Sequence, residues 1–305
     1  MGDDERVSFV IPSSLEEALE ALAAGARPIG GGTDLVVGAR QGKTPLPTSL
    51  VAVDRLHELA SIESTDGGIR IGAVVTHARL MVDPTVVASY TALADSAALI
   101  GSPSTRNVGT IGGNVMNASP AMDTGAPLMV LNAVAQLQSV HGSRTVELSD
   151  LWIGPGQTSA ATDELCVFVD LPVRPNNSGS AYVRLEYRRA MEIAVVGAAA
   201  SVTLAEDGTI SDGSVALSAV APTIIEVVDA NAVMAGLEPE SAAEAIAVAA
   251  SNVAAPIADL RASETYRTHT VGVMAARAVK AAASRASGEA IGVPVNRTVG
   301  VGAAK

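Results

Sequence analysis

The spacing of hydrophobic and polar positions predicts a small α/β unit at the start of the chain. The stretch VSFVIPSSLEEALEAL predicts a short strand followed by a helix, because its leucines and alanines recur at helical spacing. Ser14, three residues before Glu17, predicts a capping box at the start of that helix. The apolar runs RPIGG and TSLVAVDRL predict two more strands. Together these elements form a βαβαβ unit that ends near residue 55.

The middle of the chain has a mixed pattern. An alanine-rich run predicts one helix over residues 85–99, and ELCVFVDLP predicts a buried strand. Between them lies IGSPSTRNVGTIGGNVMNASPAMD, a segment rich in Gly, Ser, Asn and Pro that we expect to be irregular. Irregular segments of that length inside an apolar chain are usually functional.

The last part of the chain predicts a sheet followed by helices. Residues 172–180, PVRPNNSGS, have the composition of a linker. The alternation in SAYVRLEYRR predicts a half-buried strand, and Asp207–Gly208 predicts a hairpin turn. Residues 240–286 are alanine-rich and predicted to be helical, whereas NRTVGVGAAK is expected to be a loose tail. The expected domains are therefore 1–55, 56–175 and 180–286, with a tail at 287–305.

Composition narrows the classes of function. Lys and Arg total 20 against 32 Asp and Glu, and the net charge of −12 argues against binding to nucleic acid or an anionic membrane. Cys166 is the only cysteine, so the chain's own thiolates cannot hold an iron–sulfur cluster or form an intrachain disulfide. The four histidines are far apart in sequence, and no metal site is expected. The acidic start MGDDERVS and the lack of a long apolar run indicate a cytoplasmic protein without membrane insertion.

The glycine-rich stretch RPIGGGTDLVVGARQGKT raises the question of which phosphate it binds. GARQGKT has three residues between its glycines where a nucleotide-triphosphate loop needs four, and Pro45 and Pro47 oppose the helix that must follow. The glycines at 30, 31 and 32 do not form the G-x-G-x-x-G pattern of a Rossmann dinucleotide site. Both of these sites are therefore rejected.

A diphosphate held by two separate glycine loops fits better. Gly30–Gly32 follow a predicted strand and precede a helical pattern, where Thr33 is expected to be the helix cap and free amides face an anion. GTIGGN, residues 109–114, is the second loop, and its glycines permit close approach of the backbone. Either loop alone is compatible with an ordinary turn. Two such loops in separate subdomains predict a ligand at the seam between them.

The motifs PIGGGTDL and SPSTRNVGTIGGNVMNASPAMD resemble those of the FAD-binding medium subunits of molybdenum hydroxylases, which include aerobic carbon monoxide dehydrogenase and xanthine dehydrogenase. The resemblance continues through LCVFVDLP and YRRAMEIAVVGAAASV and covers most of residues 5 to about 285. It implies an α+β architecture: a two-subdomain FAD-binding fold of the vanillyl-alcohol oxidase type, followed by a C-terminal domain of antiparallel sheet and helices.

The resemblance assigns both loops to the FAD diphosphate. The first comprises Pro28, Ile29, Gly30, Gly31, Gly32, Thr33, Asp34 and Leu35. The second comprises Thr110, Ile111, Gly112, Gly113 and Asn114. The implied donors are the amides of residues 30–34 and 112–114, assisted by the side chains of Thr33, Thr110 and Asn114.

Further cofactor contacts are implied by the same resemblance. Asp123 matches a residue near the ribityl chain, with a helix cap as the alternative. Ile100 matches a residue that packs on the cofactor, with ordinary core as the alternative. Cys166 matches an apolar position near the cofactor and is interpreted as packing. Arg184 matches a basic residue near the flavin that stabilises the anionic reduced ring, with a solvated strand residue as the alternative.

Three weaker assignments concern Tyr187, Arg106 and His77. Tyr187 is a candidate to flank the flavin, and Arg106 to place positive charge near the diphosphate or at the surface. His77 is interpreted as structural, after a helix cap at Thr76.

The implied function is electron transfer without a catalytic side chain. FAD is expected to bind non-covalently, because neither loop contains the His or Cys that covalent attachment uses. A small subunit with two [2Fe–2S] clusters and a large molybdopterin-binding subunit are the expected partners, in a dimer of heterotrimers. FAD would pass their electrons to an external acceptor. The alternatives are a self-sufficient FAD-dependent oxidoreductase of the same fold and a non-catalytic scaffold. The sequence does not identify the substrate or the acceptor.

Overall fold

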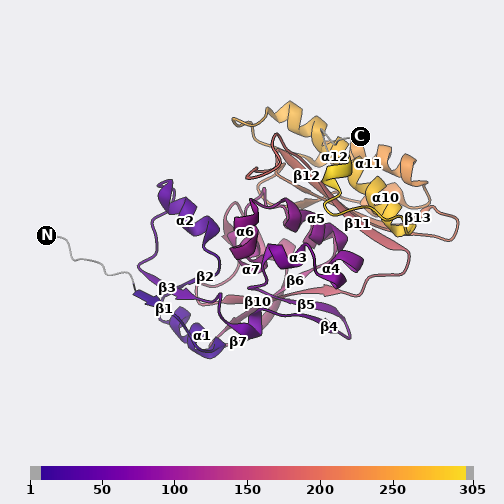
Figure 1. Cartoon of the computed structure of the whole chain (residues 1–305). Coiled ribbons are helices and arrows are strands. Elements are labelled where there is room, and N and C mark those ends of the chain that lie inside the picture. The colour runs from indigo at the N-terminus through magenta and orange to yellow at the C-terminus, as the bar shows by residue number, and fades with distance from the viewer. Residues whose placement is uncertain (1–7, 300–305) are drawn as a thin grey trace.

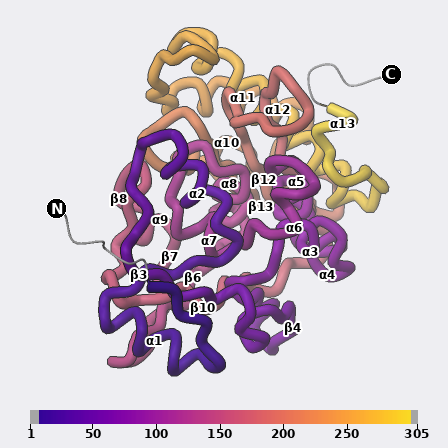
Figure 2. Tube along the Cα trace, turned by 60° about the vertical axis from the view of Figure 1, so that its left-hand side comes forward, coloured from indigo at the N-terminus to yellow at the C-terminus, as the bar shows by residue number. Residues whose placement is uncertain are grey.

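The structure is a computed structural model that describes residues 8–299; residues 1–7 and 300–305 lie outside this description. The chain runs from an N-terminal unit, in indigo, through a middle unit to a C-terminal domain in orange and yellow (Figure 1). Figure 2 shows the N-terminal sheet at the lower left and the C-terminal helices at the top.

The N-terminal unit is the predicted βαβαβ arrangement. Its elements are β1 (Ser8–Val10), α1 (Leu15–Ala23), β2 (Arg27–Ile29), α2 (Thr33–Arg40) and β3 (Ser49–Ala52). The strands form a parallel sheet in the order β1-β3-β2. The Ser14 hydroxyl accepts a hydrogen bond from the Glu17 amide, so the predicted cap of α1 is confirmed. A short 3₁₀ helix, η1 (His57–Leu59), leads into the next unit.

The middle unit is built on an antiparallel sheet in the order β4-β5-β10-β6-β7. Its strands are β4 (Ile62–Thr65), β5 (Gly68–Gly72), β6 (Val134–Ser139), β7 (Gly142–Glu147) and β10 (Leu165–Pro172), the last of which was predicted. Its helices are α3 (His77–Leu80), α4 (Pro84–Ser89), α5 (Thr91–Leu99), α6 (Pro103–Val108), α7 (Ile111–Asn117), α8 (Gly125–Val130) and α9 (Leu148–Leu151). A small hairpin, β8 (Trp152–Gly154) and β9 (Gln157–Thr158), completes the unit.

Two predictions for the middle unit were wrong. The single helix over 85–99 is two helices, which break at Tyr90, where the ring is buried and its hydroxyl donates to the Pro172 carbonyl. The segment expected to be irregular contains α6 and α7, each started by a side-chain cap from Ser102 or Thr110. Serine and threonine at these positions begin helices rather than prevent them.

The C-terminal domain is an antiparallel sheet covered by helices. Its strands are β11 (Ser178–Leu185), β12 (Val196–Leu204), β13 (Ile210–Ser218) and β14 (Ile225–Glu226). Its helices are α10 (Ala230–Met234), α11 (Pro239–Val253), α12 (Glu264–Ala286) and α13 (Asn296–Val299). The predicted hairpin turn at Asp207–Gly208 joins β12 to β13, and the predicted helical region contains α11 and α12.

The strand β11 differs from its prediction, because both of its faces are buried. Val183 and Leu185 pack with α12, whereas Tyr182 belongs to the core of the middle unit. The tail also differs from its prediction: within residues 287–299, Val295 and Asn296 are buried against the body of the protein. Among residues 8–299, no helix is long and apolar enough to cross a membrane.

Candidate functional site

The first glycine loop presents a run of unpaired amides. In the described part of the chain, the N–H groups of Gly30, Gly31, Gly32, Thr33 and Asp34 have no hydrogen-bond acceptor. Gly32 is the N-cap of α2 with a φ of +66°, and no side chain caps this helix. The expectation that Thr33 is the cap was wrong, since Thr33 is already the first helical residue. The loop therefore keeps its donors available for an anion.

The second loop uses its amides internally. The Gly112 amide donates to the Ala73 carbonyl at 2.9 Å, the Gly113 amide to Thr110 Oγ1 at 3.1 Å, and the Asn114 amide to the Thr110 carbonyl at 3.0 Å. These three amides build the first turn of α7 and attach it to the end of β5. That the second loop contacts the FAD diphosphate stays a prediction. Asn114 Oδ1 also has a partner, the Thr124 hydroxyl.

The two loops meet at a contact that only glycine permits. A Cβ atom on Gly31 would lie 1.8 Å from the Val108 carbonyl oxygen, and one on Gly30 would lie 3.1 Å from Thr110 Oγ1. A cleft of about 280 Å³ lies at this junction. It is lined by Gly30, Gly31, Asp54, Val74, Thr76, Asn107, Val108 and Thr110. The predicted seam between the subdomains is thus present, and it contains residues that the motifs did not indicate.

His77 lies beneath the second loop. Its amide donates to the Gly109 carbonyl at 3.1 Å, and its ring is buried with no hydrogen-bond partner for Nδ1. Burial, assisted by the positive charge of Arg106, lowers the pKa of His77 to about 4. The imidazole is therefore neutral at physiological pH. Thr76 caps α3 as expected, by accepting from the Arg79 amide.

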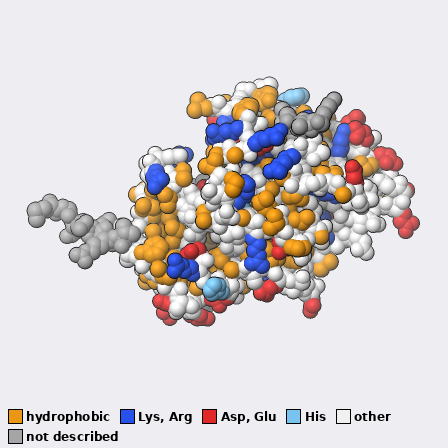
Figure 3. Space-filling view, viewed as in Figure 1, with side chains coloured by type: hydrophobic (Ala, Val, Ile, Leu, Met, Phe, Trp, Pro, Cys, Tyr) orange, Lys and Arg blue, Asp and Glu red, His pale blue; other side chains and the backbone are white. Residues whose placement is uncertain are grey.

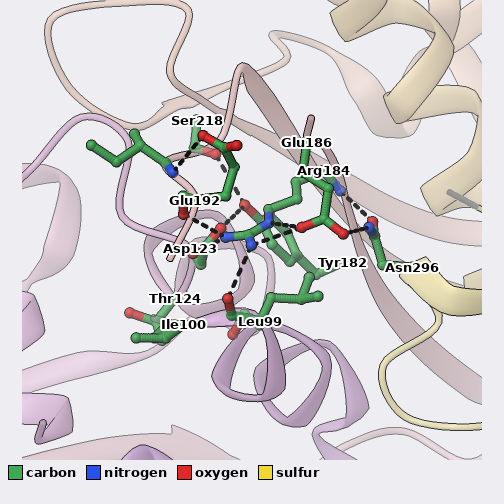
Figure 4. A network of polar contacts seen from close by, with 12 residues as sticks. Leu99, Ile100, Asp123, Thr124, Tyr182, Arg184, Glu186, Glu192, Ser218 and Asn296 are labelled. Carbon is green, nitrogen blue, oxygen red and sulfur yellow. Dashed lines mark hydrogen bonds and ion pairs between the residues drawn. The ribbon is translucent and has the colours of Figure 1, made fainter. Parts of the chain in front are cut away.

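Asp123 and Arg184 form an ion pair between the middle unit and the C-terminal domain (Figure 4). Arg184 Nη1 donates to Asp123 Oδ2 at 2.6 Å, and the Tyr182 hydroxyl donates to Asp123 Oδ1 at 2.8 Å. Arg184 is completely buried, so the alternative of a solvated strand residue is excluded. Asp123 does not cap the following helix, whose N-cap is Thr124 without a side-chain bond.

Three other candidates are placed by the structure. Ile100 is half-buried at the end of α5, and its carbonyl accepts from Arg106 Nη1 at 2.8 Å. Cys166 lies in the core of the middle unit, where burial raises the pKa of its thiol to about 12. The side chain is therefore a neutral thiol, which agrees with its interpretation as a packing residue. Tyr187 is exposed, and its hydroxyl donates to the Arg261 carbonyl. Neither Cys166 nor Tyr187 lines the cleft.

The negative net charge is unevenly distributed. On the face shown in Figure 3, Lys and Arg side chains gather over the middle and upper parts, whereas Asp and Glu lie mainly along the lower and right-hand edges. Partial burial lowers the pKa of Arg106, and the positive charge of nearby Arg297 lowers it further. An anionic ligand can therefore approach this face even though the whole chain carries a charge of −12.

These features fit the diphosphate of a dinucleotide. Consecutive free amides before a helix are suited to phosphate oxygens, and the glycine contact lets two subdomains close on a ligand without side chains between them. Within residues 8–299, no group of three or more His, Cys, Asp or Glu side chains could hold a metal ion.

Comparison with known proteins is consistent with this geometry. Residues 5–174 match the family model described as the FAD binding domain in molybdopterin dehydrogenase. Residues 181–282 match the CO dehydrogenase flavoprotein C-terminal domain.

The relatives are similar over nearly their whole length. A putative xanthine dehydrogenase FAD-binding subunit from Escherichia coli is 31% identical, over 92% of this chain and 98% of the relative. The carbon monoxide dehydrogenase medium chain of Afipia carboxidovorans is 31% identical, over 90% and 96%.

Solved structures show the same architecture. A crystal structure of the Cu,Mo-CO dehydrogenase matches with a TM-score of 0.87 at 30% identity, covering 92% of this chain and 98% of that chain. Quinoline 2-oxidoreductase from Pseudomonas putida matches with a TM-score of 0.84 at 28% identity, covering 92% and 97%. The expected FAD-binding fold with its C-terminal flavoprotein domain is confirmed. The chain therefore belongs to the FAD-binding subunits of the molybdenum hydroxylase family of oxidoreductases.

Proposed function

We propose that this chain binds FAD non-covalently, with the diphosphate on the first glycine loop and the cleft at the junction of the two loops. The observation that carries the proposal is the run of amides from Gly30 to Asp34, which has no acceptor in the described chain and lies where Gly31 contacts Val108. Each phosphate oxygen accepts hydrogen bonds from such donors, and the N-terminus of α2 adds its partial positive charge.

The residues of the chain bind and orient the cofactor. The first loop supplies backbone donors, and the Thr110 side chain lies against Gly30 at the cleft wall. Bound FAD supplies the capacity to accept and release electrons, which no protein side chain here provides. Neither loop contains a His or Cys for covalent attachment. We therefore assign no general acid or base to this subunit.

We further propose that the chain is one subunit of a larger enzyme. The relatives carry the names medium chain and FAD-binding subunit. In the proposed complex, a small subunit with [2Fe–2S] clusters delivers electrons to this chain, and a large subunit with molybdopterin acts on the substrate. Two such heterotrimers form the assembly, and an external acceptor removes the electrons. The single, buried Cys166 is consistent with clusters held on another chain.

Purification of the native complex tests this proposal. We expect FAD, molybdenum and iron together with two further subunits, whereas the isolated chain retains FAD alone and shows no substrate turnover. Turnover by the isolated chain would support the alternative, a self-sufficient oxidoreductase. A colourless chain that takes up no FAD would overturn both.

A further inference from the structure

The wall of the cleft depends on a tight bend between α5 and α6. Gly101 has a φ of +50°, and a Cβ there would lie 2.7 Å from the Thr105 side chain. This bend begins α6, and the end of α6 carries Asn107 and Val108, which line the cleft. A shift of the bend therefore moves the surface against which Gly31 packs.

Two donors of the C-terminal domain form hydrogen bonds to backbone carbonyls of this bend. Arg184 Nη2, on β11, donates to the Leu99 carbonyl at 3.0 Å. The Met191 amide, in the loop between β11 and β12, donates to the Gly101 carbonyl at 2.9 Å. The carbonyl between them, on Ile100, accepts from Arg106 of α6 itself. Three successive carbonyls are thus fixed, two of them from another domain.

Arg184 is itself held firmly (Figure 4). Its Nε donates to Glu186 Oε2 at 2.9 Å, and its amide donates to Asn296 Oδ1 at 2.8 Å. Burial alone lowers the pKa of the guanidinium, but the charges of Asp123 and Glu186 outweigh that effect, so the pKa lies above its ordinary value. A planar guanidinium reaches Leu99, Asp123 and Glu186 at once, which a lysine ammonium cannot do in the same geometry.

We propose that Arg184 is a positioning residue for the cofactor cleft. It acts through the Leu99 carbonyl, which sets the start of α6, and through the Asp123 carboxylate, rather than by touching the flavin. The C-terminal domain thereby fixes the cleft wall although it supplies none of the lining residues. The inference rests on the proposed function only for its FAD readout.

The test compares Arg184→Lys with Arg285→Lys in the full chain. Arg285 is the matched control, because it is also a nearly buried arginine that joins the C-terminal domain to α5, through Asp95. It also donates to the Ser180 carbonyl within its own domain. We expect faster amide hydrogen exchange over residues 100–106 in Arg184→Lys but not in Arg285→Lys, with or without FAD. We also expect FAD to bind about tenfold more weakly in Arg184→Lys alone, because a charge-assisted hydrogen bond is lost.

Exchange that is unchanged in Arg184→Lys, or equally faster in both variants, would overturn the proposal. A wild-type chain that binds no FAD would instead remove the proposed function and leave the exchange result standing. If Arg184→Lys does not fold, Glu186→Gln releases the guanidinium from one side and carries the same expectation.

Adding Asp123→Asn tests whether Arg184 acts through the Asp123 carboxylate. If Arg184 acts through Asp123, the affinity of the double variant for FAD equals that of the single variant with the lower affinity. Fully additive losses would show that Arg184 and Asp123 act independently on FAD binding and would contradict the route through Asp123.

Discussion

At the scale of single residues, backbone atoms make the tightest contact between the two loops. Gly31 faces the Val108 carbonyl with no room for a methyl group, and the amides around it have no other use. Asp123 and Arg184, which the motifs suggested as cofactor ligands, are directed toward each other. The chemistry of the site therefore depends on a few atoms whose positions the rest of the fold must maintain.

Gly31→Ala should abolish FAD retention. The new Cβ would lie 1.8 Å from a backbone oxygen, so the two loops must separate. Gly38→Ala, in α2 of the same segment, is the control, because a Cβ there meets nothing within 4 Å. FAD content and fluorescence titration of both purified variants check the expectation, and a Gly31→Ala chain with normal FAD content would contradict it.

His77 should make stability depend on pH. The pKa of His77 is about 4 in the folded chain, against 6.5 for an unperturbed histidine. Between these two pH values the ring is mostly protonated in the unfolded chain and mostly neutral in the folded chain. Stability should therefore fall as pH decreases from about 6.5 toward about 4, by about 2 kcal/mol between about pH 7.5 and about pH 5.

Urea unfolding at the two pH values measures this dependence. His77→Gln should lose about 2 kcal/mol of it, whereas His57→Gln, at an exposed site, should retain the wild-type dependence. Identical pH dependence in wild type and His77→Gln would show that the ring takes up a proton as readily in the folded chain as in the unfolded chain, which contradicts the expectation.

At the scale of elements, local patterns identified much of the fold. The βαβαβ unit, the hairpin at Asp207–Gly208 and the C-terminal helices follow from periodicity and turn residues that lie close together in sequence. The sequence did not predict the helices α6 and α7, because Gly, Ser, Asn and Pro lower helix propensity. Tertiary contacts, such as the Gly112 bond to Ala73, stabilise the helical conformation and are not visible in the local sequence. The burial of both faces of β11 was missed because its polar residues pair across a domain boundary.

The packing of α11 on α12 gives a test at this scale. Alanine normally stabilises a helix interior relative to glycine by about 1 kcal/mol. In Gly272→Ala, however, the Cβ would lie 2.4 Å from the Ala247 carbonyl oxygen and 2.5 Å from Ser251 Oγ. Overpacking of this kind costs about 1–3 kcal/mol, so we expect net destabilisation.

Gly38→Ala again supplies the comparison, since α2 has open space at that position and should gain stability. Urea unfolding of both variants measures the difference. Stabilisation by Gly272→Ala would mean that α11 and α12 lie further apart than described.

At the scale of the whole molecule, buried charges join the domains. Asp95 of α5 pairs with Arg285 of α12 and accepts from the Val295 amide, and Arg184 joins β11 to the middle unit. Partners 190 residues apart leave no local signal in the sequence. The two glycine loops were predictable because each has its own motif. Their contact, the cleft between them and the clamp on the α5–α6 bend depend on how distant segments pack.

The most direct test of the central claim is the structure of the chain reconstituted with FAD. The account predicts diphosphate oxygens within hydrogen-bond distance, about 2.7–3.2 Å, of the amides from Gly30 to Asp34. It also predicts that the cofactor occupies the cleft where Gly31 contacts Val108. A dinucleotide bound elsewhere, or a diphosphate that leaves those amides without an acceptor, would contradict the account.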